Sequence, residues 1–291
     1  MDRRTSAFGH VRRTYDPLVA SEINRAFWDE RVPIHTASKF YDVEGFKAGR
    51  EPLQGFELEA LGDESGRSLV HLQCHFGLDT LSWARHGARV TGLDFSAPAI
   101  EAASVLAADI GVEADFVCAD VYDAVKVFDG RSFDIVYVNV GAINWLPDIR
   151  RWAGIVEALL EPGGVLFMKE VHPFSWVFSD DDLTVDSDYF EHRNHYDEPG
   201  TYTDPDAPTV HNQTEEWQHP LSEVVNAVIG AGLVLELLDE YDHQVYQQWP
   251  FMEKDGSVYR MPQGTPRLPL LYSLRARKPV ERRAHQATQG R

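Results

Sequence analysis

The sequence predicts an α/β protein built on a mostly parallel β-sheet with helices on both faces. Two observations support this class. From Ser68 onward, short apolar runs alternate with stretches of helical periodicity, which is typical of strand–helix–strand units. The runs are apolar at successive positions and not at every second one, as expected when helices cover both faces of a parallel sheet.

The elements follow in order from the N-terminus. Residues 1–62 are predicted to form a helical cap, in which 22–31 is an amphipathic helix with Ile23, Ala26 and Phe27 on one stripe. The main domain, 63–278, is predicted to begin with strands at 68–74, 88–95, 114–120, 133–140 and 164–171. The helices between them are predicted at 80–86, 98–108 and 149–160, with Pro98 at the start of the second and Pro162-Gly163-Gly164 after the third.

Residues 172–217 interrupt this alternation and are interpreted as a long insertion after the fifth strand. The segment is rich in aromatic residues and holds ten acidic residues between 180 and 206. A helix at 220–230 and strands at 233–241 and 269–278 then complete the domain. Residues 279–291 are a basic tail.

Charge and composition exclude several classes of protein. The net charge of −19 is the balance of +3 in residues 1–13, +5 in 275–291 and −27 between them. An acidic body repels a phosphate backbone, so DNA and RNA are excluded as substrates and a small molecule is the expected partner. Two cysteines, no zinc-site spacing, no apolar run of about 18 residues and no secretory signal predict a cytoplasmic protein without a membrane partner. The oligomeric state, a homodimer included, is left open.

Residues 70–96 carry the first chemical signal. They predict a strand, a tight loop, a helix and a second strand that ends at Asp94, 17 residues after Gly77. Ligands of open parallel sheets bind beyond the carboxyl ends of the strands. A carboxylate there suits the vicinal hydroxyls of a ribose because it accepts two hydrogen bonds.

This stretch resembles the first motifs of class I S-adenosylmethionine-dependent methyltransferases, and the likeness covers about 68–171 and 217–278. It implies a Rossmann-like seven-stranded sheet whose last hairpin adds an antiparallel strand, and S-adenosylmethionine as cofactor. Gln73 and His75 stand where the family usually has glycines, and only Gly77 is kept. By the same resemblance, Asp94 binds the ribose with Phe95 beside the adenine. Asp120 and Val121 bind the adenine, and Asn139 lies near the sulfonium.

The main rival is a nicotinamide-dependent dehydrogenase of Rossmann fold. That class needs the pattern G-x-G-x-x-G after the first strand, which the sequence here lacks. The methyltransferase interpretation is therefore preferred.

The acceptor side is predicted from position and residue type. Glu170 and His172, at the end of the fifth strand, are the candidate catalytic bases. Trp28, His35 and Tyr41 resemble the N-terminal lid of a bacterial subgroup of these enzymes, and Trp217 and His219 return the chain to the sheet. Arg193, in the insertion, is the last candidate substrate-binding residue. The alternative interpretation is that these side chains have structural roles.

The most specific hypothesis is C-methylation of a prenyl diphosphate such as geranyl diphosphate, as in bacterial enzymes that the chain resembles. Aromatic faces would stabilise a carbocation and Glu170 would remove the proton. Mg²⁺ would then assist diphosphate binding, with Arg193, His192 and His195 as partners, whereas Asp180, Asp181 and Asp182 also fit a solvated loop. The alternatives are an O- or N-methyltransferase of a secondary metabolite, a non-catalytic cofactor-binding protein and a protein-interaction role for the acidic loop.

Overall fold

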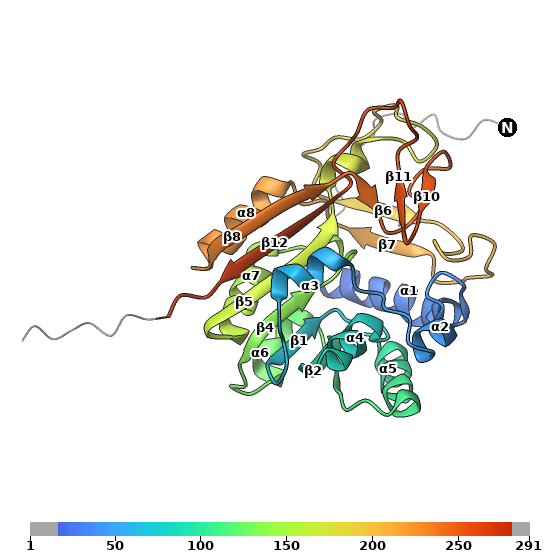
Figure 1. Cartoon of the computed structure of the whole chain (residues 1–291). Coiled ribbons are helices and arrows are strands. Elements are labelled where there is room, and N and C mark those ends of the chain that lie inside the picture. The colour runs from blue at the N-terminus through green and yellow to red at the C-terminus, as the bar shows by residue number, and fades with distance from the viewer. Residues whose placement is uncertain (1–16, 281–291) are drawn as a thin grey trace, which may run out of the picture.

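The computed structural model describes residues 17–280 and contains a seven-stranded sheet between two layers of helices (Figure 1). The strand order is β3-β2-β1-β4-β5-β12-β8, in which β1 to β5 are parallel and β12 runs antiparallel to both of its neighbours. The strands are β1 (Ser68–Leu72), β2 (Arg89–Asp94), β3 (Asp115–Cys118), β4 (Phe133–Val138), β5 (Leu160–Val171), β8 (Val234–Tyr241) and β12 (Leu271–Arg277). The predicted fold class is confirmed.

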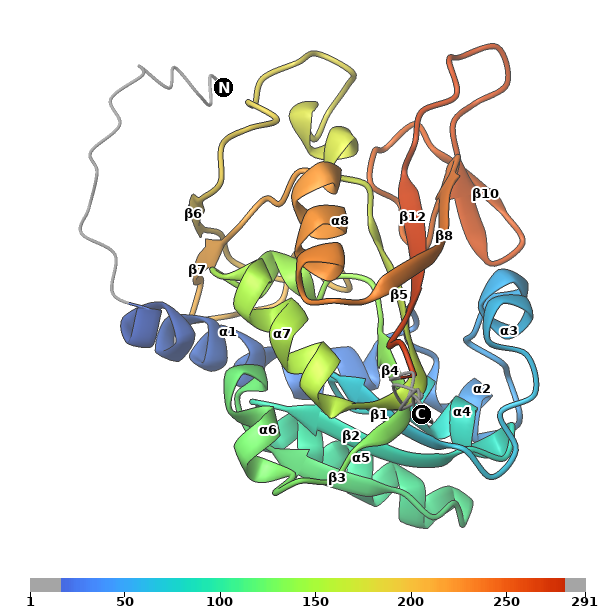
Figure 2. The same ribbon diagram turned by 90° about the vertical axis from the view of Figure 1, so that its left-hand side faces the viewer.

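Helices cover both faces of the sheet because successive strand residues point to opposite sides (Figure 2). Leu69 packs with Leu61 and Trp83 on one face, whereas the next residue, Val70, packs in the core of the other face with Trp152. The first layer is formed by α3 (Gly55–Leu61), α4 (Leu78–Arg85) and α5 (Ala97–Ile110). The second is formed by α6 (Ala124–Val127), α7 (Ile149–Leu159) and α8 (Leu221–Gly230).

Helix α1 (Pro17–Ala37) is twice as long as the predicted helix at 22–31 and includes Pro33. It packs against α5 and β7 (Gln213–Glu216), and Figure 2 shows it beside β7. The short helix α2 (Val43–Lys47) follows, and the Asp42 side chain caps it by accepting from the backbone N–H of Gly45. The N-terminal segment therefore reaches the insertion, which the sequence did not predict.

The insertion and the C-terminal region contain small elements that the sequence pattern did not predict. They are η3 (Pro173–Val177), β6 (Asn194–Asp197), β9 (His243–Gln244), β10 (Glu253–Asp255) and β11 (Val258–Arg260). Two further short helices, η1 (Val121–Asp123) and η2 (Ile143–Trp145), follow β3 and β4. Strand β6 pairs with β7, and β9 to β11 form a three-stranded sheet. These strands were missed because they are short and polar, so they carry no apolar periodicity.

The described residues contain no helix that is both long and apolar enough to span a membrane. The basic N-terminal segment 1–13 and residues 281–291 of the basic tail lie outside the described residues.

The strand order reverses at β1. Strands β2 and β3 lie on one side of β1, and β4 and β5 lie on the other. In open parallel sheets this reversal opens a crevice beyond the carboxyl ends of the strands, where ligands bind. The loops that follow β1, β2, β3, β4 and β5 therefore define the region in which to look for a site.

Candidate functional site

The loop between β1 and α4 adopts left-handed backbone conformations at three alternate residues: Gln73 (φ 58°), His75 (φ 50°) and Gly77 (φ 79°). This conformation is unfavourable for residues with a side chain, so local contacts must hold it. The Gln73 side chain donates to the carbonyl of Ala142 at 2.7 Å, and the His75 N–H donates to Asp94 at 2.8 Å. The turn predicted here is present, although two of its usual glycines are replaced.

Packing explains the residues chosen at two further predicted cofactor positions. A Cβ atom on Gly77 would lie 2.9 Å from the Phe116 ring and 3.1 Å from Ala103, so the glycine lets the loop approach β3 and α5. Val121 is buried in the core beneath α6 and α7. Both residues therefore position the backbone that borders the predicted cofactor site.

Asp94 joins the end of β2 to the loop. Its Oδ2 accepts from the His75 N–H and its Oδ1 accepts from the Ser96 N–H at 2.9 Å. The Phe95 N–H also contacts the carboxylate, so of its roughly four lone-pair positions at least one remains for a ligand. Burial is the main cause that raises the pKa of Asp94 to about 6, and the charge of Asp29 on α1 contributes to the rise. One Asp29 carboxylate oxygen is buried and has no hydrogen-bond partner among the described residues.

The residues predicted to hold the adenine lie beside the same helix. Asp120, after β3, accepts from the Tyr122 N–H at 2.9 Å and from the Ser21 hydroxyl at 3.1 Å. The Arg25 guanidinium lies 5.7 Å from the centre of the Phe95 ring. Asp120 and Phe95 therefore face α1 at neighbouring strand ends.

Asn139 lies at the end of β4 and is hydrogen-bonded to Asp79, in the first turn of α4. Its side-chain oxygen accepts from the Val140 N–H at 2.7 Å. Burial raises the pKa of Asp79 to about 6, while the charge of Lys169 lowers it. The carboxylate of Asp79 is therefore a polar group of the site that the sequence analysis missed.

One face of α1 covers this row of residues. Ser21, Arg25, Trp28 and His35 follow the spacing of a single helix face, and they contact Asp120, Phe95 and His75. The Trp28 ring centre lies 5.2 Å from that of His75. The helix thus passes over the ends of β3, β2 and β1.

Two histidines connect this helix to the loop. His35 Nδ1 lies 3.0 Å from His75 Nε2, and His35 Nε2 lies 2.6 Å from the Thr201 hydroxyl of the insertion. Burial lowers the pKa of His35 to about 3 and that of His75 well below its usual value, so both rings are neutral near pH 7. The Tyr41 and Tyr202 hydroxyls form a second contact between the same segments. All three predicted lid residues therefore gather around His75.

Glu170, at the end of β5, is almost fully buried and hydrogen-bonds only to backbone. Oε1 accepts from the N–H groups of Ala142 at 3.0 Å and Ile143 at 3.3 Å. Oε2 accepts from Gly141 and, at 3.1 Å, from Val171. Burial raises the pKa of Glu170 to about 7 even though these four hydrogen bonds lower it. All of its lone-pair positions are therefore engaged, three with the loop after β4 and one with Val171 on β5.

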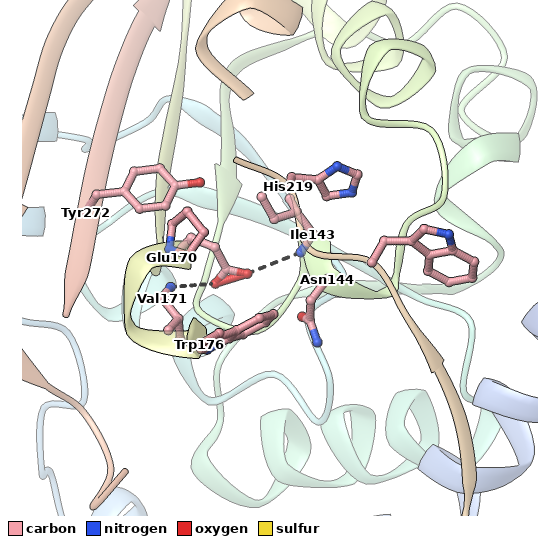
Figure 3. Close-up of a pocket in the computed structure, with 9 residues that line it drawn as sticks. Ile143, Asn144, Glu170, Val171, Trp176, His219 and Tyr272 are labelled. Atoms are coloured by element: carbon pink, nitrogen blue, oxygen red, sulfur yellow. Dashed lines mark hydrogen bonds between the residues drawn. The ribbon is translucent and has the colours of Figure 1, made fainter. Parts of the chain in front are cut away.

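A pocket that opens to solvent lies against Glu170 (Figure 3). Its walls come from the loop after β4, the end of β5, η3, the segment before α8, and β12. The lining residues are Ile143, Asn144, Glu170, Val171, Pro173, Trp176, Trp217, His219 and Tyr272. Its enclosed part, about 20 Å³, is about the space of one water molecule, so the pocket is narrow in this structure.

Two of the predicted substrate residues line this pocket. The Trp217 N–H donates to the carbonyl of Asn144 at 2.7 Å, which ties the end of the insertion to η2. The ring nitrogens of His219 lie 2.8 Å from the carbonyl of Leu146 and 3.0 Å from the carboxylate of Glu223. His219 thus forms a wall of the pocket, while both of its ring nitrogens contact other protein groups.

His172 is not among the lining residues. Its Nδ1 accepts from the Phe174 N–H at 3.1 Å, which caps η3, and its Nε2 lies 2.8 Å from the Glu240 carboxylate. The ring therefore positions η3 and contacts β8. A catalytic role for His172 stays a prediction without a supporting contact.

The cationic groups of the insertion are paired with glutamates. Arg193 donates to Glu215 at 2.8 Å, and His195 lies 3.1 Å from the same carboxylate. His192 lies 3.6 Å from Glu223. In the part of the chain that the structure describes, no three His, Cys, Asp or Glu side chains are grouped to hold a metal ion. The structure thus offers no diphosphate or Mg²⁺ site at these predicted residues.

Sequence reasoning missed four polar residues of the region: Asp29, Asp79, Asn144 and Glu216. Asp29 lies one residue after Trp28 in the predicted lid, and Asp79 follows the loop by two residues, so position gave a signal for both. Glu216 precedes the predicted Trp217, but the sequence could not tell whether Glu215 or Glu216 faces the site. Asn144 lies in a turn without a motif.

Comparison with known proteins agrees with this geometry. Residues 70–166 match the family model described as a methyltransferase domain. The ubiquinone biosynthesis O-methyltransferase of Cronobacter sakazakii is 31% identical over 149 residues, which are 49% of this chain and 60% of that protein. The protein of the same name from Methylobacterium nodulans is 29% identical over 153 residues, 50% of this chain and 58% of its own length. The chain thus spans less than two thirds of these curated relatives.

Solved structures share the fold at low sequence identity. An S-adenosylmethionine-dependent methyltransferase from Mesorhizobium loti has a TM-score of 0.52 and 21% identity, covering 76% of this chain and 95% of that one. One from Listeria monocytogenes has a TM-score of 0.54 and 16% identity, covering 77% and 96%. The magnesium protoporphyrin IX methyltransferase of Synechocystis has a TM-score of 0.51 and 14% identity, covering 90% and 100%. These likenesses confirm the predicted class I methyltransferase fold.

Proposed function

We propose that the protein transfers the methyl group of S-adenosylmethionine to a small-molecule acceptor, since residues 70–166 match the family model of a methyltransferase domain. The observation that carries the proposal is the convergence of Asp94, Asp120 and the left-handed loop 73–77 at adjacent strand ends, beneath one face of α1. The pocket against Glu170 lies beside this region, at the ends of β4 and β5. A cofactor side and an acceptor side thus meet at the crevice where the strand order reverses.

The polar atoms of the cofactor side fit S-adenosylmethionine. Gln73 Oε1 and Asp29 Oδ1 are buried hydrogen-bond acceptors without a partner among residues 17–280, and Asp94 keeps at least one lone-pair position. The cofactor offers matching donors in its ribose hydroxyls, amino groups and ammonium. Asp94 would hold the ribose, Asp120 the adenine, and Gln73 with loop 73–77 the amino-acid end. When bound, the cofactor supplies an electrophilic methyl group on a sulfonium.

The protein positions an acceptor on the other side. Methyl transfer is an in-line displacement whose rate depends on how the two reactants are aligned. By accepting the backbone N–H groups of all three residues, Glu170 fixes the loop 141–143 that forms one wall of the pocket. The pocket combines three aromatic rings, from Trp176, Trp217 and Tyr272, with this buried carboxyl. Such walls exclude water from the reacting groups.

Acceptors that lose a proton from oxygen or nitrogen are favoured over a prenyl diphosphate. The names of the curated relatives specify O-methylation. A diphosphate would need free cations, yet the Arg193 and His195 side chains that were predicted to bind it contact Glu215. C-methylation of an alkene remains the alternative, supported by the aromatic walls, and Mg²⁺ is not part of the proposal.

Two measurements test the function. Calorimetric titration with S-adenosylhomocysteine is expected to show one binding site per chain, and a silent titration would refute the cofactor assignment. Methyl-labelled S-adenosylmethionine is then incubated with phenols, amines and geranyl diphosphate, the last with and without Mg²⁺. Labelled oxygen or nitrogen products are expected, whereas a methylated prenyl product alone would establish the C-methylation alternative.

A cofactor-binding protein without catalysis is the second candidate, and one observation favours it. Gln73 and His75 place side chains where glycines would leave the loop open. Under this alternative, S-adenosylhomocysteine binds but no compound of the panel is methylated, and no turnover to S-adenosylhomocysteine is detected.

A further inference from the structure

Strand β7 carries two adjacent glutamates whose side chains have different partners. Glu215 is bound by Arg193 and His195, and its backbone forms two hydrogen bonds with the Asn24 side chain of α1. Successive residues of a strand point to opposite faces, so Glu216 points the other way. Its partners there are the Asn144 amide at 3.3 Å and the Thr214 hydroxyl at 3.2 Å.

Asn144 connects Glu216 to the pocket. It is 93% buried and lines the pocket together with Glu170 and Trp176, as Figure 3 shows. Its amide nitrogen donates to Glu216, which leaves its carbonyl Oδ1 as the other polar atom. That oxygen is buried and has no hydrogen-bond partner in the described part of the chain. A buried acceptor without a donor is costly, so this atom points to a donor on a ligand.

Glu216 is not itself among the lining residues, and it reaches the pocket through its hydrogen bond with Asn144. Within residues 17–280, neither Glu170 nor Glu216 forms an ion pair with a lysine or arginine. Burial raises the pKa of Glu216 to about 7. The region therefore offers hydrogen-bond acceptors, negative charge and aromatic faces, a combination that suits a cation with N–H donors.

We infer that the acceptor carries a basic nitrogen, which Asn144 Oδ1 and Glu216 bind as a donor and from which Glu216 takes the proton. The inference rests on the proposed methyl transfer and names its substrate class. Glu170 has four N–H partners and no lone pair left, whereas Glu216 has two partners and keeps lone pairs for a substrate. Glu216 is accordingly the base, and Glu170 is a positioning residue.

Glu216 accepts one proton from the ammonium of the acceptor, which frees a lone pair on nitrogen. That lone pair forms the nitrogen–carbon bond while the bond from the methyl carbon to sulfur breaks and its electron pair stays on sulfur. The products are a methylated ammonium, the neutral thioether and protonated Glu216, which returns its proton to water. No oxidant or metal is needed.

Binding of matched small molecules tests this inference independently of turnover. Phenethylamine, 4-ethylphenol and 3-phenylpropionate are similar in size but carry a cationic amine, a neutral hydroxyl and an anion. Calorimetry at pH 8 on the full chain, with S-adenosylhomocysteine present and absent, should show phenethylamine binding at least about tenfold more tightly than the other two. Equal or tighter binding of 4-ethylphenol or 3-phenylpropionate, or no binding of the amine, overturns the inference.

Substitutions test which residues bind the amine. Glu216→Gln keeps the size of the side chain but removes its charge, so it should weaken phenethylamine binding by about tenfold or more. Asp197→Asn is the matched control, since it removes one negative charge from an exposed position of the same hairpin and should change binding less than about twofold. If Glu216→Gln fails to fold, Asn144→Ala removes the free carbonyl oxygen and should also weaken the amine. Unchanged binding in a folded variant contradicts the inference.

The outcomes separate this inference from the proposed function. If S-adenosylhomocysteine binds and 4-ethylphenol, but no amine, is methylated, the function stands and the nitrogen acceptor is wrong. If S-adenosylhomocysteine does not bind, the function itself fails, whatever the amine does. N-Methylphenethylamine, detected by mass spectrometry with the native chain and strongly reduced in Glu216→Gln, supports both.

Discussion

Replacing Glu170 by glutamine distinguishes a residue that holds a loop from a catalytic base. The substitution keeps the shape of the side chain but turns one of its two oxygens into an NH₂ group. In the native protein both oxygens accept backbone N–H groups, from Ala142 and Ile143 on one side and from Gly141 and Val171 on the other. In either orientation of the amide, two buried backbone N–H groups then face the new NH₂ group, which cannot accept their hydrogen bonds.

The expected loss follows from those two donors. A buried N–H without an acceptor costs about 1–3 kcal/mol, so the free energy of unfolding should fall by about 2–6 kcal/mol. A domain is typically stable by about 5–15 kcal/mol, so the loss is large. Glu216→Gln is the comparison, because only two groups contact that carboxylate and it is less buried, and its loss should stay near 1 kcal/mol.

Urea unfolding at pH 8, followed by tryptophan fluorescence, measures both variants. A lower midpoint with an unchanged slope is expected for Glu170→Gln. Methyl transfer is assayed without urea, under conditions in which each variant is folded. If Glu170→Gln is as stable as the native protein to within about 0.5 kcal/mol while methyl transfer is lost, the loop-holding role is wrong and Glu170 acts as the base after all.

Three further predictions concern the cofactor side. Asp94→Asn should weaken S-adenosylhomocysteine binding by about 10- to 100-fold in calorimetry, since hydrogen bonds to a charged group contribute about 1.5–3 kcal/mol, and a change below twofold contradicts the ribose assignment. Because the pKa of Asp94 is raised to about 6, the folded state keeps a proton that the unfolded chain releases near pH 4. Stability should therefore fall by up to about 3 kcal/mol as pH rises from about 4 to about 6, and urea midpoints of Asp94→Asn should show a smaller fall. Since His75 has a φ of 50°, His75→Gly should be about 1 kcal/mol more stable than His75→Ala in urea unfolding, and the reverse order would refute strain at this position.

The sheet could be predicted because its strands are buried on both faces, a pattern that local sequence carries. Leu69 and Val70 are neighbours in the chain and belong to the cores on opposite sides of the sheet. The length of α1 could not be predicted in the same way. Its boundary depends on contacts with β7, far along the chain, and Pro33 within the helix argues against its continuation.

The cofactor loop shows where a motif based on residue identity is incomplete. Glycine is usual in the family because the backbone needs positive φ, and Gln73 and His75 adopt that conformation with side chains present. Contacts with Ala142 and Asp94 hold them there, and both partners lie at least 19 residues away. The position of the loop could therefore be predicted from the sequence, but the hydrogen bonds that hold it could not.

On the acceptor side, the sequence shows which charges exist but not which of them neutralise one another. Arg193 suggested an anionic substrate until the fold placed Glu215 at 2.8 Å from it. Glu216 differs from Glu215 by one position, and the alternation of β7 turns it toward Asn144, which lines the pocket. A shift of one residue in the pairing of β6 with β7 would exchange the two carboxylates and reverse the inference about the acceptor. The preference for a nitrogen acceptor thus depends on strand register, so Glu216→Gln and Glu215→Gln should affect phenethylamine binding very differently.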